Sequence, residues 1–414
     1  MFVESLNCQK CGKKFPPKEK LYVCKNCGGK LTVVIDYEKV KKIISRQVLE
    51  DREGGVWKYK ELLPVDEEKN MISIGEGNTP LIKVDRLGDV LGINDLWLKE
   101  ETQNPTSSFK DRPMSVGVSK ALEFDAETVV TASSGNAATA LAAYSAKGDI
   151  ECYAFVPEDA PEAKIAQIAL HGANVVRAAS QKVGDPCYEL MKLGFENFGW
   201  HPIPSGGAFN PYQPEGNKTM SFEICEQFDW QPPDWHIVPV GAGTLLSGNA
   251  KGYFEFEELG IVEEVPKIGG IQAEGCAPLV KGFKEDLDPY EIPTWENPET
   301  VAGGLMDPYP WDADTAIPAI KKSEGTAEMA SDEEILSAVK LLAESEGIFA
   351  EPSGAAGIAG LIELLKNDIV DRSEKVVVNV TGGGLKDQET AVRLAGETPK
   401  IEAKLDQLKK LVQN

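Results

Sequence analysis

Three apolar runs in this chain end in turns of small residues, and two of these turns lead into helical patterns. The runs and their turns lie at 129–138, 238–248 and 376–387. A buried strand followed by a tight turn and a helix is the unit of a parallel sheet with helices on both faces. Backbone N–H groups at such a turn, reinforced by the positive end of the helix, also bind anions. The pattern therefore predicts an α/β fold with anion sites at its turns.

The alternation of strand and helix patterns extends over most of the chain. Strands are expected at 96–99, 129–131, 151–156, 173–176, 236–240, 268–273 and 375–380. We expect two domains, each with a doubly wound parallel sheet, and a site between them at the carboxyl ends of the strands. A passage rich in Pro, Trp and Asp at 288–314 predicts a long loop. The amphipathic stretch 401–412 predicts a helix that packs on the body or on a partner subunit.

Lys110 is the residue of this sequence that best fits chemistry at a carbonyl. The turn formers Asn104 and Pro105 precede it, and an amphipathic stretch follows. A lysine at a helix start lies beside free backbone N–H groups and the positive helix end, which disfavour its ammonium form. This context favours a neutral amine that attacks a carbonyl. Taken alone, the stretch is equally compatible with a surface lysine after a loop.

The eight cysteines divide into a paired set and a scattered set. Two Cys-x-x-Cys pairs with twelve residues between them predict a zinc ribbon over residues 1–34, with Cys8, Cys11, Cys24 and Cys27 as ligands. Four protein ligands leave no open position, so the expected Zn²⁺ is structural. Disulfides or cysteines that bind no metal are the alternatives. The scattered set is expected to be buried and reduced: Cys152, Cys187, Cys225 and Cys276.

Net charge and hydropathy restrict the partners of this protein. The formal net charge of the 414 residues is −23, which opposes binding to nucleic acid and to anionic membrane surfaces. No apolar run approaches the length of a membrane span, and the N-terminus has no charged-then-apolar signal pattern. We therefore expect a cytoplasmic protein that binds neither nucleic acid nor a membrane.

Taken in order, the motifs resemble those of the fold type II enzymes that use pyridoxal 5′-phosphate, and within them the threonine synthases. The resemblance runs from about residue 70 to about residue 395 and is carried by the stretches 75–81, 104–111, 133–138, 210–219, 351–356 and 381–387. It implies a small mobile domain at 104–214, embedded in a large domain formed by 35–103 and 215–414. It also implies that the protein is a homodimer and that it binds a small amino-acid substrate.

The resemblance implies a role for each site residue. The cofactor aldehyde would form a Schiff base with Lys110, which then moves protons once substrate displaces it. Asn136 would donate to the 3′-oxygen of the ring, and Thr381 would hydrogen-bond the pyridine nitrogen. The cofactor phosphate would bind to Gly241, Ala242, Gly243, Thr244 and Leu245. The substrate carboxylate would bind to the loop that holds Ser133, Ser134, Gly135 and Ala137.

The implied activity is that of a threonine synthase, which converts O-phospho-L-homoserine and water to L-threonine and phosphate. This chain departs from the family where the substrate phosphate is bound. The family has a hydroxyl residue, an Arg and an Asn where this sequence has Ala137, Gln213 and Ala242. Two further motif positions, usually Gly and His, are Ser107 and Gly383. A buried dianion without a cationic partner is costly, so other cations would have to compensate.

Lys218, Arg112 and Lys386 are the cationic residues that we expect to compensate. If none does, a serine or threonine dehydratase, or a β-replacement synthase on the same scaffold, becomes the alternative. A binding protein that kept the fold without the cofactor is a third possibility, which the presence of the Schiff-base lysine opposes. A hydrolase triad is unsupported because none of the histidines pairs with a Ser or Cys motif: His171, His201 and His236.

Overall fold

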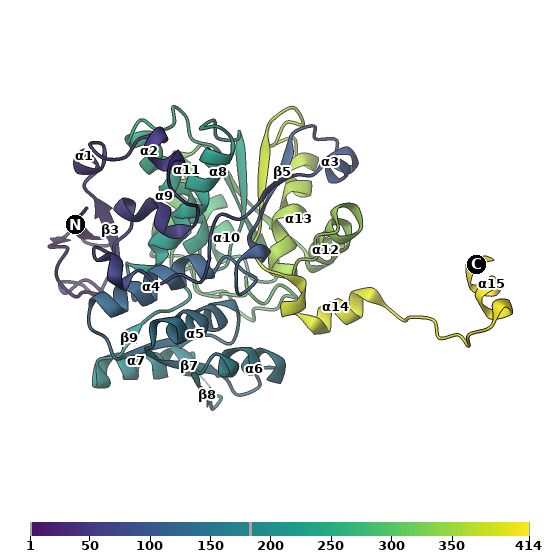
Figure 1. Ribbon diagram of the computed structural model, residues 1–414, viewed down its shortest axis with the longest axis horizontal. Coiled ribbons are helices and arrows are strands. Elements are labelled where there is room, and N and C mark those ends of the chain that lie inside the picture. The colour runs from purple at the N-terminus through teal and green to yellow at the C-terminus, as the bar shows by residue number, and fades with distance from the viewer. Residues whose placement is uncertain (1, 182–183, 414) are drawn as a thin grey trace.

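The computed structural model describes residues 2–181 and 184–413, and its largest sheet has six strands in the order β12-β11-β10-β13-β5-β4 (Figure 1). The strands are β4 (Leu81–Lys83), β5 (Leu96–Glu100), β10 (Trp235–Pro239), β11 (Lys267–Ala273), β12 (Thr326–Ala330) and β13 (Val376–Val380). All pairs are parallel except β4 with β5. Every residue of β10 and of β13 is buried, as a parallel strand covered on both faces requires.

Successive residues of β10 contribute to two different cores. Val238 packs in the core that includes α9 (Thr244–Glu258), whereas Ile237 packs in the core that includes α13 (Pro352–Lys366). Side chains alternate across a strand, so helices on both faces follow directly from the all-apolar strand. The remaining helices of this region are α3 (Asp85–Leu91), α8 (Thr219–Gln227), α10 (Pro278–Lys284), α11 (Ala313–Lys322) and α12 (Asp332–Glu346).

A second, parallel sheet has four strands in the order β8-β7-β6-β9 and falls entirely within residues 104–214. Its strands are β6 (Thr128–Ala132), β7 (Glu151–Pro157), β8 (Asn174–Ala178) and β9 (His201–Pro202). Its helices are α4 (Asp111–Glu123), α5 (Asn136–Gly148), α6 (Glu162–Leu170) and α7 (Pro186–Phe198). The predicted α/β fold is confirmed. The four-stranded sheet is wholly parallel, whereas the six-stranded sheet is mixed because β4 runs antiparallel to β5.

The N-terminal ribbon is a three-stranded antiparallel sheet of β1 (Val3–Cys8), β2 (Lys14–Phe15) and β3 (Leu31–Ile35). It packs on the body because Leu6, Leu31 and Ile35 belong to the same core as Phe256 of α9. Short helical segments then lead to β4: α1 (Tyr37–Val40), α2 (Arg46–Glu50), η1 (Val56–Leu62) and η2 (Glu68–Asn70).

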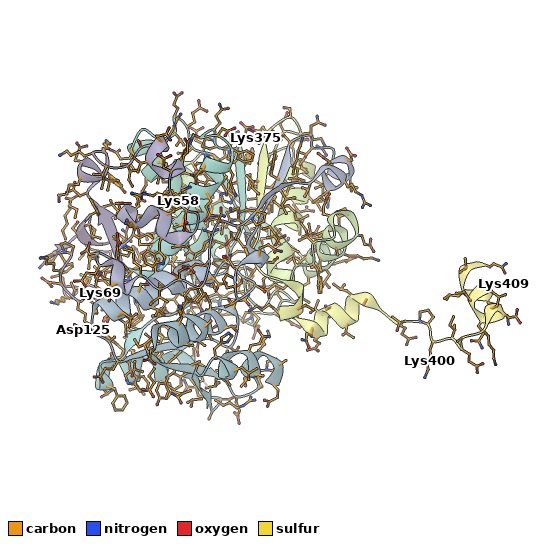
Figure 2. The ribbon with its side chains drawn as sticks, viewed as in Figure 1. Lys58, Lys69, Asp125, Lys375, Lys400 and Lys409 are labelled. Atoms are coloured by element: carbon orange, nitrogen blue, oxygen red, sulfur yellow. The ribbon has the colours of Figure 1, made fainter. Side chains whose placement is uncertain are left out.

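The C-terminal segment leaves the body of the protein. After α14 (Gln388–Ala395), an extended stretch carries α15 (Leu405–Gln413) away from the sheets, and Lys400 and Lys409 lie on this extension (Figures 1 and 2). The predicted helix is present. It does not pack on the body, since Leu405, Leu408 and Leu411 are exposed, and its packing on a partner subunit stays a prediction. Among the described residues, no helix combines the length and the apolar character that crossing a bilayer requires.

Candidate active site

A cavity of about 410 Å³ lies where the turns after β6, β10 and β13 meet. These turns follow strands of both large sheets, so the cavity lies at the carboxyl ends of the strands, where such folds place ligands. Its lining includes every residue predicted for the cofactor and the substrate: Lys110, Ser133, Ser134, Gly135, Asn136, Ala137, Gly241, Ala242, Gly243, Thr244, Leu245 and Thr381.

The backbone before Lys110 is held against the turn that follows β13. The Phe109 N–H donates to the Thr381 carbonyl at 3.0 Å, and the Gly383 N–H donates to the Ser107 carbonyl at 3.0 Å. Ser107 adopts a φ of +60°, a left-handed conformation that favours glycine, the usual family residue at this position. These contacts place Lys110 at the N-terminus of α4 with its side chain in the cavity wall.

The side chain of Lys110 lies in surroundings that favour the neutral amine. Burial away from water lowers the pKa of Lys110 to about 8, although Asp312 and Asp307 act in the opposite direction. The Nζ atom donates to the Ser205 carbonyl at 3.1 Å and lies 4.8 Å from the centre of the Phe109 ring. The expected direction of the pKa shift is thus found, but desolvation rather than the helix end is its largest cause.

The turn between β10 and α9, residues 241–245, forms a cradle for an anion. Within the described residues, the N–H groups of this turn make no hydrogen bond to the protein, and α9 directs its positive end toward them. Gly243 has a φ of +106°, and a Cβ atom there would lie 3.0 Å from Leu279. The Thr244 hydroxyl donates to Asp312 at 2.5 Å. Free N–H groups at a helix N-terminus fit a phosphate group such as that of pyridoxal phosphate.

The opposite turn, residues 133–137 between β6 and α5, is more open. The Ser133 N–H donates to the Phe155 carbonyl at 3.1 Å, and a Cβ atom at Gly135 would meet nothing within 4 Å. Asn136 donates through Nδ2 to the Glu351 carboxylate at 2.7 Å. Gly382 permits this pair, because a Cβ atom there would come within 2.3 Å of the same carboxylate oxygen.

Several cavity residues were missed by sequence reasoning. Residues 303–307 of the predicted long loop form part of the wall, and burial raises the pKa of Asp307 to about 7 even though the Lys110 charge opposes the shift. Glu351 was placed in a motif without a role, and burial raises its pKa as well. No local pattern marks Asp307, whereas the Glu-Pro-Ser-Gly motif marked Glu351 as part of the site.

Two of the three cations expected to compensate for the missing phosphate contacts are unavailable. Arg112 is fully buried and pairs with Glu101 and Glu223, each at 2.7 Å. Lys218 is fully buried as well, and its partners are carboxylates at 2.6 and 2.9 Å. Neither side chain lines the cavity, so the expectation for these two residues is wrong. The third, Lys386, does line it, as does a residue that was not predicted, Lys164.

Gln213, at the position of the family Arg, supports a neighbouring loop. Its Nε2 atom donates to the carbonyls of Pro204 and Gly206 at 3.3 and 2.8 Å. These residues flank Ser205, the hydrogen-bond acceptor of Lys110. Gln213 is buried behind this loop and does not line the cavity. Gln213 therefore has a structural role.

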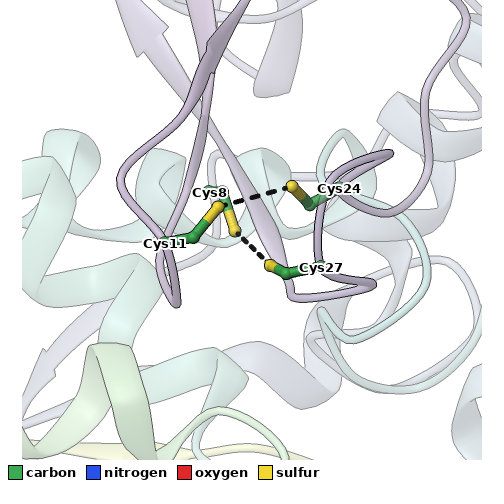
Figure 3. Close-up of side chains that lie close together, drawn as sticks. All are labelled: Cys8, Cys11, Cys24 and Cys27. Carbon is green, nitrogen blue, oxygen red and sulfur yellow. Dashed lines mark hydrogen bonds between the residues drawn. The ribbon is translucent and has the colours of Figure 1, made fainter.

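The four cysteines of the ribbon meet at one point, with all four sulfur atoms within 4.8 Å of one another (Figure 3). The Cys8 and Cys27 sulfurs are 3.5 Å apart, and those of Cys11 and Cys24 are 3.7 Å apart. Two tight turns bring the cysteines together, as their Cys-x-x-Cys spacing predicts. Such a cluster fits a tetrahedral metal. The scattered cysteines are buried thiols, as expected, and no disulfide joins cysteines of the described chain.

The histidines lie outside this cavity. His201 lies between the Tyr22 hydroxyl, at 2.8 Å, and the Asn210 side chain, and so joins the ribbon to β9. His236 contacts the Asn379 side chain at 2.7 Å within the large sheet. His171 contacts the Gln167 carbonyl at the end of α6. None is placed for nucleophilic catalysis, in agreement with the sequence.

Comparisons with known proteins agree with this architecture. The profile of a family described as pyridoxal-phosphate dependent enzymes matches residues 72–382. The chain is 44% identical to a threonine synthase of Methanocaldococcus jannaschii and 41% identical to one of Methanosarcina acetivorans, in each case over 98% of both chains. A solved structure of maize serine racemase has the same fold, with a TM-score of 0.64 at 22% identity over 81% of this chain and 91% of the other.

Proposed function

The chain belongs to the pyridoxal-phosphate-dependent enzymes and, among them, to the threonine synthases, and on that premise we propose that it converts O-phospho-L-homoserine and water to L-threonine and phosphate. The observation that carries the proposal is the cavity itself. In a chain similar to threonine synthases over 98% of its length, a lysine of lowered pKa, an anion cradle and an asparagine turn share one space.

Four parts of the cavity would hold the cofactor. The N-H groups of 241–245 would bind its phosphate, and Lys110 would attach its aldehyde carbon. The second N–H of the Asn136 amide is available for a ring oxygen, since only one is engaged by Glu351. The Thr381 hydroxyl, whose bond to the Ser353 carbonyl is long at 3.4 Å, would face the ring nitrogen. When bound, the cofactor supplies an electron sink for the charge left on a substrate carbon after proton removal.

The proton transfers fall to Lys110. Its neutral Nζ atom would take a proton from Cα of the substrate and pass it on before it takes a second proton from Cβ, because one amine holds only one extra proton. Phosphate would then leave Cγ. Protons are delivered to Cγ and Cα, and water supplies the hydroxyl group at Cβ. The sum is threonine and inorganic phosphate. With a pKa of about 8, most of the Lys110 amine is still protonated at pH 7, but its neutral fraction is far larger than that of a lysine with an ordinary pKa.

The substrate would be held by the remaining walls. Its carboxylate would bind to the backbone of 133–137, at the positive end of α5. Lys164 of α6 and Lys386 after β13 would bind its phosphate. Both line the cavity, and the charges of both act on Glu351, although neither forms an ion pair with a carboxylate in the described part of the chain. Burial lowers the pKa of Lys386, which Glu351 and Asp111 partly oppose. These two lysines would supply the charge that Ala137, Gln213 and Ala242 do not.

We further propose that the cluster of Cys8, Cys11, Cys24 and Cys27 holds a structural Zn²⁺ and that the enzyme is a homodimer. The sulfur separations support the metal. Metal analysis of the purified protein and light scattering test these two statements. One zinc per chain and twice the mass of 44.9 kDa are expected.

The deciding experiment supplies O-phospho-L-homoserine to the purified, cofactor-loaded enzyme and measures phosphate and threonine together. Equal amounts of the two products are expected. The second candidate, a serine or threonine dehydratase, is favoured by the uncharged residues at three phosphate-binding positions. Ammonia release from serine or threonine, with no phosphate release from O-phospho-L-homoserine, would replace our proposal with that candidate.

A further inference from the structure

Lys30, three residues after the last ribbon cysteine, reaches from the ribbon into the body of the protein. Its Nζ atom donates to Asp312 at 2.8 Å and to the Thr315 hydroxyl at 2.9 Å, and it also pairs with Asp314. The side chains of Lys30 and Asp312 are only 8% and 3% exposed. Removing one partner of so deeply buried an ion pair would leave the other charge uncompensated, at a high cost in free energy.

Asp312 in turn contacts both sides of the cavity wall. One carboxylate oxygen accepts from the Thr244 hydroxyl at 2.5 Å and from the Gly207 N–H at 3.0 Å. The Asp312 N–H donates to the Ala242 carbonyl at 3.0 Å. Thr244 and Ala242 belong to the anion cradle, and Gly207 follows the loop whose Ser205 carbonyl accepts from Lys110. A continuous set of contacts therefore runs from the ribbon to the cradle.

The charge of Asp312 is unfavourable beside a bound phosphate unless it is compensated. Two anions in a desolvated site repel each other. The Thr244 hydroxyl has one hydrogen, so while it donates to Asp312 it cannot also donate to a phosphate oxygen. Burial opposes the charged form of Asp312, yet Lys30 holds the pKa of that carboxyl below its ordinary value. Lys30, which Asp312 shares with Asp314, is thus the cation that offsets the Asp312 charge behind the cradle.

The sulfur cluster fixes the backbone next to Lys30. A Cβ atom at Gly29 would lie 3.1 Å from the Cys8 sulfur and 3.2 Å from the Cys27 sulfur, so the chain passes directly against the cluster. The Lys30 carbonyl accepts from the Gln9 N–H at 3.0 Å. The position of Lys30 consequently depends on the order of the ribbon.

We propose that Lys30 is a positioning residue that makes phosphate binding at 241–245 depend on an intact cysteine cluster, because it neutralises and orients Asp312. This inference rests on the proposed role of that turn in holding the cofactor phosphate. The ribbon then serves the active site through one buried ion pair, in addition to stabilising the N-terminus.

The test measures the affinity of the full-length apoenzyme for pyridoxal phosphate, by titration followed in absorbance. Lys30→Met leaves Asp312 unpaired and should weaken binding by about tenfold or more. The double variant Lys30→Met/Asp312→Asn removes both members of the ion pair next to the cradle. Asp314 then keeps its charge without Lys30, but it makes no contact with the cradle, so binding should return to within about threefold of wild type. Lys25→Met is the matched control, because Lys25 lies in the same ribbon but is exposed. Circular dichroism checks that each variant is folded.

Two results would overturn the inference: binding by Lys30→Met within twofold of wild type, or a double variant as weak as the single one. A second arm introduces Cys11→Ser into wild type and into the double variant. The cysteine change should weaken binding in wild type and have almost no further effect in the double variant. An equal effect in both would show that the ribbon does not act through Lys30. Because cofactor affinity is the readout, the outcome is independent of whether O-phospho-L-homoserine is the substrate.

Discussion

The two turns that face each other across the cavity have the same local design but different support. Residues 241–245 are held by residues from distant elements. The Gln272 side chain donates to the Gly241 carbonyl at 3.1 Å, the Asp312 backbone N–H donates to the Ala242 carbonyl, and the Asp312 carboxylate accepts from the Thr244 hydroxyl. Residues 133–137 are half-buried for the most part and depend on neighbouring strands and on one amide–carboxylate contact to Glu351.

This difference indicates a division of labour. Both turns offer backbone N–H groups at the N-terminus of a helix, which is the chemistry of an anion site. A turn braced by a buried ion pair is suited to a group that stays bound through many reaction cycles, namely the cofactor phosphate. A turn with few tertiary contacts can adjust to a substrate that enters and leaves. We therefore call residues 241–245 the fixed wall and residues 133–137 the adaptable wall.

The largest effect is expected at Lys110, which lies between the walls. Lys110→Ala removes the amine that moves protons and should lower phosphate release by at least about a thousandfold. The fixed wall should still bind pyridoxal phosphate reversibly, which dialysis and absorbance would detect. A variant with more than about one per cent of wild-type turnover would contradict the assignment of Lys110.

The second-largest effect is expected at Lys164 and Lys386, the two lysines proposed to bind the substrate phosphate. Lys164→Met and Lys386→Met should each raise KM for O-phospho-L-homoserine about tenfold, as loss of a charge-assisted hydrogen bond implies. Turnover at saturation and cofactor affinity should change little. Lys192→Met, in an exposed lysine of α7, is the control. An unchanged KM in the variant that lacks both cavity lysines would contradict their proposed role in binding the substrate phosphate.

A smaller effect is expected in pH dependence. Because the pKa of Lys110 is about 8, the rate at which apoenzyme takes up the cofactor should rise with pH and level off above that value. Asp307 stabilises the ammonium form, so Asp307→Asn should move the midpoint to lower pH. Stopped-flow absorbance between pH 6 and about 9.5 measures both midpoints. A midpoint that moves upward would show that Asp307 does not act on Lys110.

The smallest effect is expected at Ser107, which supports Lys110 from a left-handed conformation. Ser107→Gly removes a backbone cost of about 1–2 kcal/mol but gains entropy in the unfolded state, so its free energy of unfolding should stay within about 1 kcal/mol of wild type. Ser107→Val, which is β-branched, should be less stable than both. Urea unfolding tests the order, and a Val variant as stable as wild type would contradict it.

Local sequence patterns were sufficient to predict the features of the fold that depend on residues close together in the chain. The apolar strands and the small-residue turns after them predicted most of the parallel strands of both sheets, and all the predicted pocket residues line one cavity. The β-prone run 21–24 forms only an isolated bridge between Val23 and Lys30. The strand β12 was missed because its Thr-Ala-Glu-Met-Ala sequence lacks the β-branched character of a buried strand.

What could not be predicted depends on contacts between distant residues. Lys30 and Asp312 are 282 positions apart, and neither lies in a recognisable motif. Arg112 appeared free in sequence, but its partner Glu223 comes from α8 and removes it from the cavity. The charge state and accessibility of a side chain are set by tertiary packing, which residue spacing does not encode.

The most direct test of the two-wall account is a pair of crystal structures of the cofactor-loaded enzyme, without and with a phosphonate analogue of O-phospho-L-homoserine. We predict that 241–245 superpose within about 1 Å, that 133–137 shift by more than about 2 Å toward the analogue, and that the phosphonate contacts Lys164 and Lys386. Movement of 241–245 over an unchanged 133–137, or a phosphonate bound away from both lysines, would contradict the account.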